Sequence, residues 1–184
     1  DKNRGYFGKN DKSWKYLIND MNYLEGMMRM EFPDIPYFML GHSMGSFLAR
    51  EYIAAYGNGF SGAVFMGSGY TNPMLPGGIL LSKYMSKKKP GEKGELLNRI
   101  AFGSFNRKIK DSETNFDWLS TDKDMVDKYI NDDKCGFLFT NEGYRDLFLL
   151  IKDVNTVKWA KSLPQDLPML IISGSDDPVG NYGK

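Results

Sequence analysis

The first regular pattern of apolar positions predicts an amphipathic helix that begins near Ser13. Its apolar side chains recur at the 3.6-residue period of a helix, at Trp14, Leu17, Ile18, Met21, Leu24 and Met28. Either Asp11 or Ser13 can cap the first turn. The dipeptide Phe32-Pro33 ends the helix, and the polar residues 1–12 before it are predicted as a loop. We interpret the methionines as core filler rather than as a binding surface.

Three short, almost wholly apolar runs predict the strands of a parallel sheet. They occupy residues 37–40, 62–67 and 168–172. Apolar character without alternation is typical of strands that are covered on both faces. A second helix is predicted between the first two runs, ending near Tyr56, and its apolar positions are Phe47, Leu48, Ile53, Ala54 and Ala55. This order of elements predicts the α/β class, with a parallel sheet flanked by helices.

About a hundred residues separate the second and third predicted strands, far more than an ordinary crossover requires. They contain helical patterns around Leu97, Val126 and Phe148 and no good strand. We therefore predict a helical cap inserted between two strands, which divides the chain into residues 1–69, 70–160 and 161–184. The large apolar side chains of this insertion are Phe102, Phe105, Phe116, Trp118, Leu119, Phe137 and Phe139. Most are expected to form its own core, while a minority could line a lipophilic pocket.

Composition and charge exclude several function classes. A formal net charge of +1 gives no electrostatic case for nucleic acid. The longest apolar run, residues 147–151, is far shorter than the ~18 residues of a membrane span. The single cysteine, Cys135, favours a reducing, cytoplasmic location. The basic run Lys87-Lys88-Lys89 is interpreted as a solvated loop, with peripheral contact to anionic lipid head groups as the functional alternative. We expect no metal and no cofactor.

The run Gly41-His42-Ser43-Met44-Gly45 lies between a predicted strand and a predicted helix. In that context G-x-S-x-G predicts a nucleophile elbow, in which Ser43 has a positive φ and its hydroxyl stands clear of the sheet. Gly41 and Gly45 would avoid collisions with the neighbouring strand and helix. The amide of Met44, at the helix N-terminus, would stabilise an oxyanion. The simpler alternative is a glycine-rich turn without chemistry.

Two adjacent carboxylates follow the third predicted strand, in the run Ser173-Gly174-Ser175-Asp176-Asp177-Pro178. The carboxyl end of a parallel strand is where such sheets place their chemistry. A serine nucleophile requires a carboxylate that orients the histidine base. Only one of the two can face one imidazole, and Asp-Pro is also a common turn opener. Pro178 restricts Asp177 to extended conformations, which favours Asp177 as the fixed one.

These runs together resemble the α/β-hydrolase superfamily, and more narrowly its bacterial members similar to monoacylglycerol lipases, lysophospholipases and serine aminopeptidase-like hydrolases. The matching runs are residues 40–46, Gly67-Ser68-Gly69, residues 116–120, residues 135–137 and residues 174–180. The resemblance implies a partial α/β-hydrolase fold. It also implies Ser43 as nucleophile, the amide of Met44 as an oxyanion donor, and Asp177, the residue before the proline, as the acid.

The sequence departs from the family pattern at both ends. It lacks the early strands with the His-Gly loop that supplies a second oxyanion amide, and the late strand with the catalytic histidine. Its only histidine, His42, is expected to point away from the reacting oxygen. We therefore expect both groups to lie outside this sequence, and the 184-residue chain alone to be inactive.

Three functions compete at this stage. The first is a serine esterase that cleaves a small lipophilic acyl ester, such as a monoacylglycerol or a lysophospholipid. The second is an aminopeptidase-like amide hydrolase, whose substrate amine would be held by the acidic residues Asp122, Asp124, Asp127, Asp132 and Asp133. The third is a non-catalytic acyl-binding module, which would need no catalytic histidine. A histidine beyond a further strand of the parent reading frame would separate the first two from the third.

Overall fold

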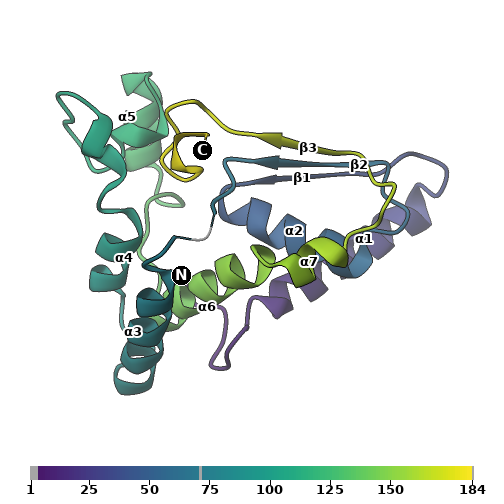
Figure 1. Cartoon of the computed structure of the whole chain (residues 1–184), viewed down its shortest axis with the longest axis horizontal. Coiled ribbons are helices and arrows are strands. Elements are labelled where there is room, and N and C mark those ends of the chain that lie inside the picture. Colours follow the sequence, from purple (N-terminus) through teal and green to yellow (C-terminus); the bar gives the residue numbers. More distant parts are fainter. Residues whose placement is uncertain (1–3, 71, 184) are drawn as a thin grey trace. The chain divides into compact units, whose positions relative to one another are not determined.

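A parallel sheet of three strands organises half of the chain (Figure 1). The computed structural model describes residues 4–70 and 72–183. The strands β1 (Phe38–His42), β2 (Gly62–Met66) and β3 (Met169–Ile172) are neighbours in that order. In register, Leu40 pairs with Val64 and Val64 pairs with Leu170. The predicted α/β class is confirmed, whereas the parts of the predicted segments at residues 1–3, 71 and 184 lie outside the described residues.

The chain forms two compact units. The sheet unit comprises Lys9–Leu75 and the chain from Asp146 onward, and the helical unit comprises Pro76–Arg145 with the described residues up to Gly8. The sheet unit holds α1 (Lys15–Glu31), α2 (Met44–Tyr56) and α7 (Val157–Lys161), and α6 (Asn141–Val154) contains the boundary. The division into residues 1–69, 70–160 and 161–184 stays a prediction.

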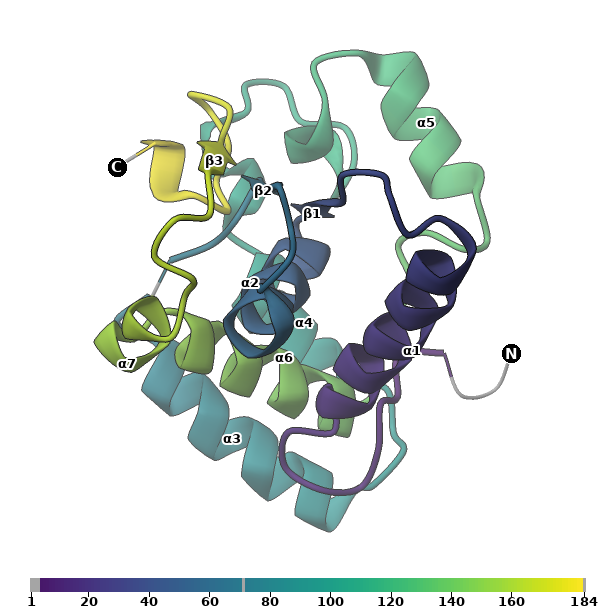
Figure 2. The same cartoon turned by 90° about the vertical axis from the view of Figure 1, so that its right-hand side faces the viewer.

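The core of the sheet unit lies between α2 and one face of the sheet. Its buried apolar side chains are Ala49, Ile53, Ala63, Phe65 and Leu167, with Met39, Phe60 and Leu163 packed against them. Figure 2, which looks nearly along the strands, shows α2 next to β1 and β2, between α1 and α7. Full burial of one such side chain contributes about 1.5–3 kcal/mol. Packing against this face therefore fixes the direction in which α2 leaves the sheet.

The opposite face of the sheet is exposed, which corrects the prediction of strands covered on both faces. Phe38 and Leu40 of β1 keep 66% and 64% of their surface accessible. All four residues of β3 are exposed as well. The apolar runs predicted the strands correctly, because strand formation follows local composition. Among the described residues of the sheet unit, no helix packs on this second face.

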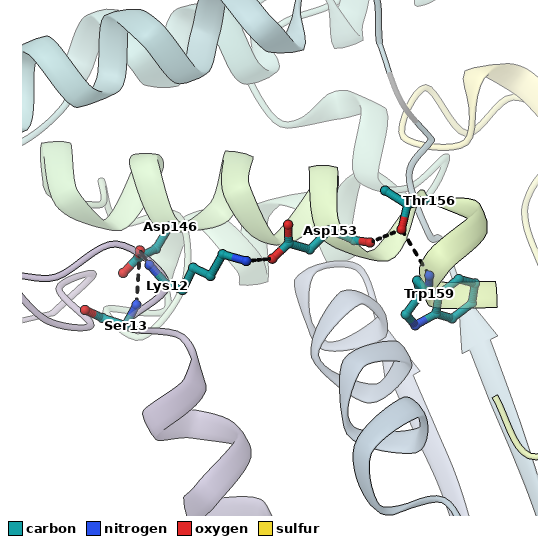
Figure 3. A network of polar contacts seen from close by, with 6 residues as sticks. All are labelled: Lys12, Ser13, Asp146, Asp153, Thr156 and Trp159. Atoms are coloured by element: carbon teal, nitrogen blue, oxygen red, sulfur yellow. Dashed lines mark hydrogen bonds and ion pairs between the residues drawn. The ribbon is translucent and has the colours of Figure 1, made fainter. Parts of the chain in front are cut away.

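The helix α1 corrects two further predictions. Its N-cap residue is Trp14, which makes no side-chain cap, so neither Asp11 nor Ser13 has that role. Instead, the buried carboxylate of Asp146, on α6, accepts hydrogen bonds from the amides of Lys12 (3.0 Å) and Ser13 (3.2 Å), as Figure 3 shows. The predicted apolar stripe is buried only at its start, at Trp14 and Ile18. Its later members Leu24 and Met28 are exposed, so they are not core residues of the described chain.

The helical unit contains α3 (Leu75–Lys88), α4 (Glu95–Phe102) and α5 (Lys123–Asn131). The helical patterns around Leu97 and Val126 are confirmed, and both side chains are buried. The aromatic residues contact one another without full burial, as in the edge-to-face pair of Phe105 and Trp118, whose centroids are 4.8 Å apart. No helix of the described residues is long and apolar enough to cross a membrane.

The basic run Lys87-Lys88-Lys89 is not simply a loop. Lys87 and Lys88 form the last turn of α3, where positive charge interacts favourably with the helix dipole. The ammonium of Lys89 lies 3.0 Å from a carboxylate oxygen of Glu92. Both observations give these lysines structural roles, and contact with a membrane surface stays untested.

The tightest packing in the sheet unit occurs where the first turn of α2 crosses the end of β1. A Cβ atom on Gly41 would lie 2.4 Å from the carbonyl oxygen of Gly45 and 2.7 Å from the Cβ of Ala49. A Cβ atom on Gly45 would meet nothing within 4 Å. The prediction that both glycines prevent collisions is therefore right for Gly41 and wrong for Gly45.

We predict opposite effects of alanine at these two glycines. Gly41→Ala forces a backbone oxygen out of its place, and we expect a loss of at least about 3 kcal/mol of unfolding free energy. Gly45→Ala, the matched control, adds helix propensity at an open position and should be neutral or stabilising by about 0.5–1 kcal/mol. Urea unfolding followed by circular dichroism measures both. Equal destabilisation by the two substitutions would contradict this packing.

Candidate active site

Ser43 forms the sharp turn between β1 and α2. Its backbone has φ 52° and ψ −123°, so the predicted positive φ is confirmed. A residue with a Cβ pays about 1–3 kcal/mol for such a conformation, which persists only where the surroundings enforce it. Here the amide of Ser43 donates to the carbonyl of Met66 (3.0 Å). The Ser43 carbonyl accepts bonds from the amide (2.9 Å) and hydroxyl (2.6 Å) of Ser46.

The side chain of Ser43 therefore belongs to the carboxyl edge of the sheet, at the start of a helix. The first amides of a helix have no partner within it and carry partial positive charge. Met44 is the first residue of α2, as the oxyanion prediction requires. Its role as an oxyanion donor is untested and stays a prediction.

The second carboxylate of the acid turn (residues 173–180) is held by its own turn. One oxygen of Asp177, Oδ1, accepts a hydrogen bond from the amide of Val179 (2.9 Å). The other, Oδ2, lies 3.4 Å from the hydroxyl of Ser173. The Asp177 amide donates to the carbonyl of Gly174 (3.2 Å), which closes the turn. Asp177 is half-buried and Asp176 is exposed, so only the former has a fixed environment.

Gly67 is the point at which the elbow and the acid turn meet. It follows β2 directly, with φ 56°, and its amide donates to the carbonyl of Ile172 at the end of β3 (2.9 Å). A Cβ atom on Gly67 would lie 3.4 Å from Nε2 of His42 and 3.5 Å from Oδ2 of Asp177. The side chains of His42 and Asp177 therefore flank the same residue, at the edge where Ser43 begins α2.

Sequence reasoning placed Ser43 and Asp177 at this edge but assigned no role of their own to three residues around them. Gly67, Ser173 and Val179 each contact the Asp177 carboxylate or border it. Gly67 could have been recognised, because the residue directly after a parallel strand lies at the carboxyl edge. The amide of Val179 and the hydroxyl of Ser173 could not, because the local turn geometry decides which group faces the carboxylate.

The described residues offer no group of three or more histidine, cysteine, aspartate or glutamate side chains that could hold a metal ion. The chemistry available at this edge is that of a hydroxyl at a helix N-terminus and a nearby oriented carboxylate. Groups of these two kinds occur in nucleophile–base–acid arrangements.

The chain is similar to known proteins in both sequence and fold. The family model described as serine aminopeptidase, S33, matches residues 3–184. A highly thermostable carboxyl esterase from Bacillus coagulans, solved in complex with glycerol, is 30% identical; the match covers 91% of this chain and 55% of the esterase, with a TM-score of 0.85. No curated protein matches the chain.

Two more distant structures share the fold alone. A lipase in its open form is 21% identical, with 95% of this chain and 57% of the lipase covered and a TM-score of 0.84. A soluble variant of monoglyceride lipase from Saccharomyces cerevisiae is 19% identical, with 98% and 56% covered and a TM-score of 0.70. The chain thus spans little more than half the length of these solved relatives. Since the family match extends over nearly the whole sequence, the chain belongs to the serine aminopeptidase (S33) family of α/β hydrolases.

Proposed function

We propose that the whole protein is a serine esterase that cleaves single-chain acyl esters, such as monoacylglycerols or lysophospholipids, through an acyl-Ser43 intermediate. One observation carries the proposal. Ser43 has the strained conformation of a nucleophile elbow at the same sheet edge as the oriented carboxylate of Asp177, with Gly67 between their segments. A glycine-rich turn without chemistry has no need of a strained serine.

In the proposed reaction, the hydroxyl oxygen of Ser43 attacks the ester carbonyl carbon while a histidine takes its proton. The amide of Met44 donates to the developing oxyanion. The histidine then gives the proton to the departing alcohol, and an acyl-serine ester remains. Water attacks that ester with the same histidine as base, which releases the fatty acid and restores Ser43. Asp177 orients the histidine and stabilises its cation.

The base of this reaction is proposed to be a histidine other than His42. His42 is the last residue of β1 and Ser43 forms the turn after it, so the two adjacent side chains leave the backbone in different directions. It is also the only histidine of the sequence. The 184-residue chain alone is therefore expected to lack the base.

The proposed substrate class rests on two supports. The Bacillus coagulans esterase was solved with glycerol, which is the alcohol component of a monoacylglycerol. The helical unit of this chain has half-buried aromatic side chains, including Phe102, Phe105 and Trp118, which could contact an acyl chain. Acyl-chain length and head group do not follow from these features.

An amide hydrolase is the second candidate, and the family description favours it. It would need acidic side chains that are free to bind a substrate amine. Asp122 caps α5 by accepting bonds from two backbone amides, Asp132 accepts a bond from the amide of Lys134, and Asp133 pairs with Arg4. Three of the five acidic side chains considered for this role thus already have local partners, which supports the ester proposal over the amide one.

We predict that turnover depends on Ser43 and not on His42. The whole protein should hydrolyse p-nitrophenyl esters, and Ser43→Ala should leave at most the roughly 10³–10⁴-fold enhancement over water that binding and oxyanion donors provide. His42→Ala should keep most of the activity. The 184-residue chain should show no turnover above background. Robust hydrolysis by that chain, or an active Ser43→Ala variant, would refute the mechanism, and an intact protein without any activity would favour an acyl-binding module.

We also predict that the two neighbouring aspartates differ sharply. Asp177→Asn should keep the fold and lower kcat on the order of 10⁴-fold, because the amide favours the wrong histidine tautomer. Asp176→Asn is the matched control one residue away, on an exposed side chain, and should change kcat little. Steady-state kinetics with circular dichroism of both variants provide the test. The reverse ranking would show that the acid is assigned one residue too late.

A further inference from the structure

Arg50 is an unusual residue at the buried side of α2. It lies two turns after Ser43, and only 9% of its surface is accessible. Burial lowers the pKa of its guanidinium to about 10. Its hydrogen-bond partners in the described part of the chain are neutral oxygens, with no carboxylate among them. Burying a cation without a counter-ion is costly, and an apolar side chain of similar volume would avoid the cost.

The guanidinium connects α2 with two segments that are far apart in the sequence, residues 68–69 and residues 154–159. Nη1 donates to the hydroxyl of Ser68 (3.2 Å) and to the carbonyl of Gly69 (3.4 Å). Nη2 donates to the side-chain oxygen of Asn155 (3.1 Å) and to the carbonyl of Val154. The planar fork of arginine is suited to holding several acceptors at once, which a lysine ammonium cannot do in the same geometry.

The guanidinium also stacks against Trp159 of α7, which follows Asn155 in the same segment. Its carbon lies 4.4 Å from the ring centroid, and the indole N–H donates to the carbonyl of Arg50 (2.9 Å). The position of Trp159 is itself fixed, because Thr156 caps α7 by accepting a bond from the Trp159 amide (3.1 Å), as Figure 3 shows. The Thr156 hydroxyl also donates to the carbonyl of Asp153, whose carboxylate pairs with Lys12. On the side of α7, Arg50 is therefore held by a series of linked polar contacts.

On its other side, Arg50 reaches the acid turn through Ser68 and Gly69. A Cβ atom on Gly180 would lie 3.6 Å from the carbonyl oxygen of Ser68, and one on Gly69 would lie 3.5 Å from the carbonyl oxygen of Val179. The backbones of the two segments are thus in close approach. Val179 supplies the amide that holds Oδ1 of Asp177. A shift of Ser68 and Gly69 would therefore move the group that orients the acid.

We propose that Arg50 is a positioning residue, which holds residues 68–69 and through them the Asp177 turn in place relative to Ser43. Its relevance to catalysis rests on the proposed esterase function. Ser43 is the N-cap residue of α2 and Arg50 lies within this helix. The same helix therefore fixes the position of Ser43 and, through the guanidinium, the position of the turn that holds Asp177.

The test compares Arg50→Lys, Ser68→Ala and their double variant with Ile53→Val. Lysine keeps the charge and loses the fork, and Ser68→Ala removes one acceptor from a half-buried side chain without altering the core. Ile53→Val is the control, because it weakens the packing of the same helix against the sheet, away from the acid turn. Hydrogen exchange of the whole protein is followed by mass spectrometry for peptides covering residues 67–70 and 173–181, with α1 as reference. The kcat and KM of the whole protein are measured in parallel.

We expect faster exchange in those two segments and unchanged exchange in α1 for Arg50→Lys, with a smaller effect of the same kind for Ser68→Ala. We expect kcat to fall on the order of 10–100-fold with KM unchanged, as for a small misplacement of reacting groups. The double variant should be no worse than Arg50→Lys, since both changes break one linkage. Exchange that rises evenly, as in Ile53→Val, with kcat unchanged, would overturn the proposal. If the unvaried whole protein hydrolyses no ester, the esterase function fails, and the exchange data alone decide whether Arg50 holds the turn.

Discussion

The constraint on which the rest of this structure depends is the close crossing of β1 and α2 at Gly41. The carbonyl of Gly45 occupies the space that a side chain at position 41 would need. The chain can reverse so sharply only if the residue between strand and helix adopts a positive φ, and Ser43 does so. The Ser43 amide donates to the carbonyl of Met66, and the Ser43 carbonyl accepts bonds from Ser46; these bonds hold the conformation. The tight packing at this crossing thus stabilises the strained backbone of Ser43, which holds its hydroxyl at a helix N-terminus.

The remaining features of the sheet unit serve to fix the same edge. Apolar packing of Ile53 and Phe65 sets the helix on the sheet, and the parallel register brings the ends of all three strands to one side. Gly67 then lies between His42 and the Asp177 carboxylate. Polar contacts of Arg50 connect the helix to the loop beneath the acid turn. The proposed nucleophile and the proposed acid are therefore both connected to one helix.

Local patterns explain what the sequence predicted well. The strands, the elbow and the helices around Val126 and Phe148 follow from composition and periodicity over short windows. The helix α3 was missed because Pro76, Gly77 and Gly78 interrupt its apolar pattern, although proline is well tolerated in a first helical turn. The bonds from the amides before α1 to Asp146 could not be foreseen, because the partners are more than 130 residues apart. The exposed sheet face was mispredicted for a related reason. Apolar composition indicates that a strand prefers to be buried, but it does not show whether another segment packs on that face.

The site could be predicted in part for the same physical reasons. Ser43 follows β1 directly and Asp177 lies in the loop after β3, so their common edge of the sheet follows from topology alone. The direction of the His42 ring and the role of Val179 depend on side-chain packing and turn geometry, which no spacing rule contains.

The most direct test of the central claim is to locate the reactive serine chemically. The whole protein is treated with a fluorophosphonate, digested, and sequenced by tandem mass spectrometry that separates Ser43 from Ser46. A single adduct on Ser43, formed in parallel with the loss of ester hydrolysis, is the predicted result. An adduct on Ser46, Ser173 or Ser175 in a protein that hydrolyses esters, with Ser43 unmodified, would contradict the account.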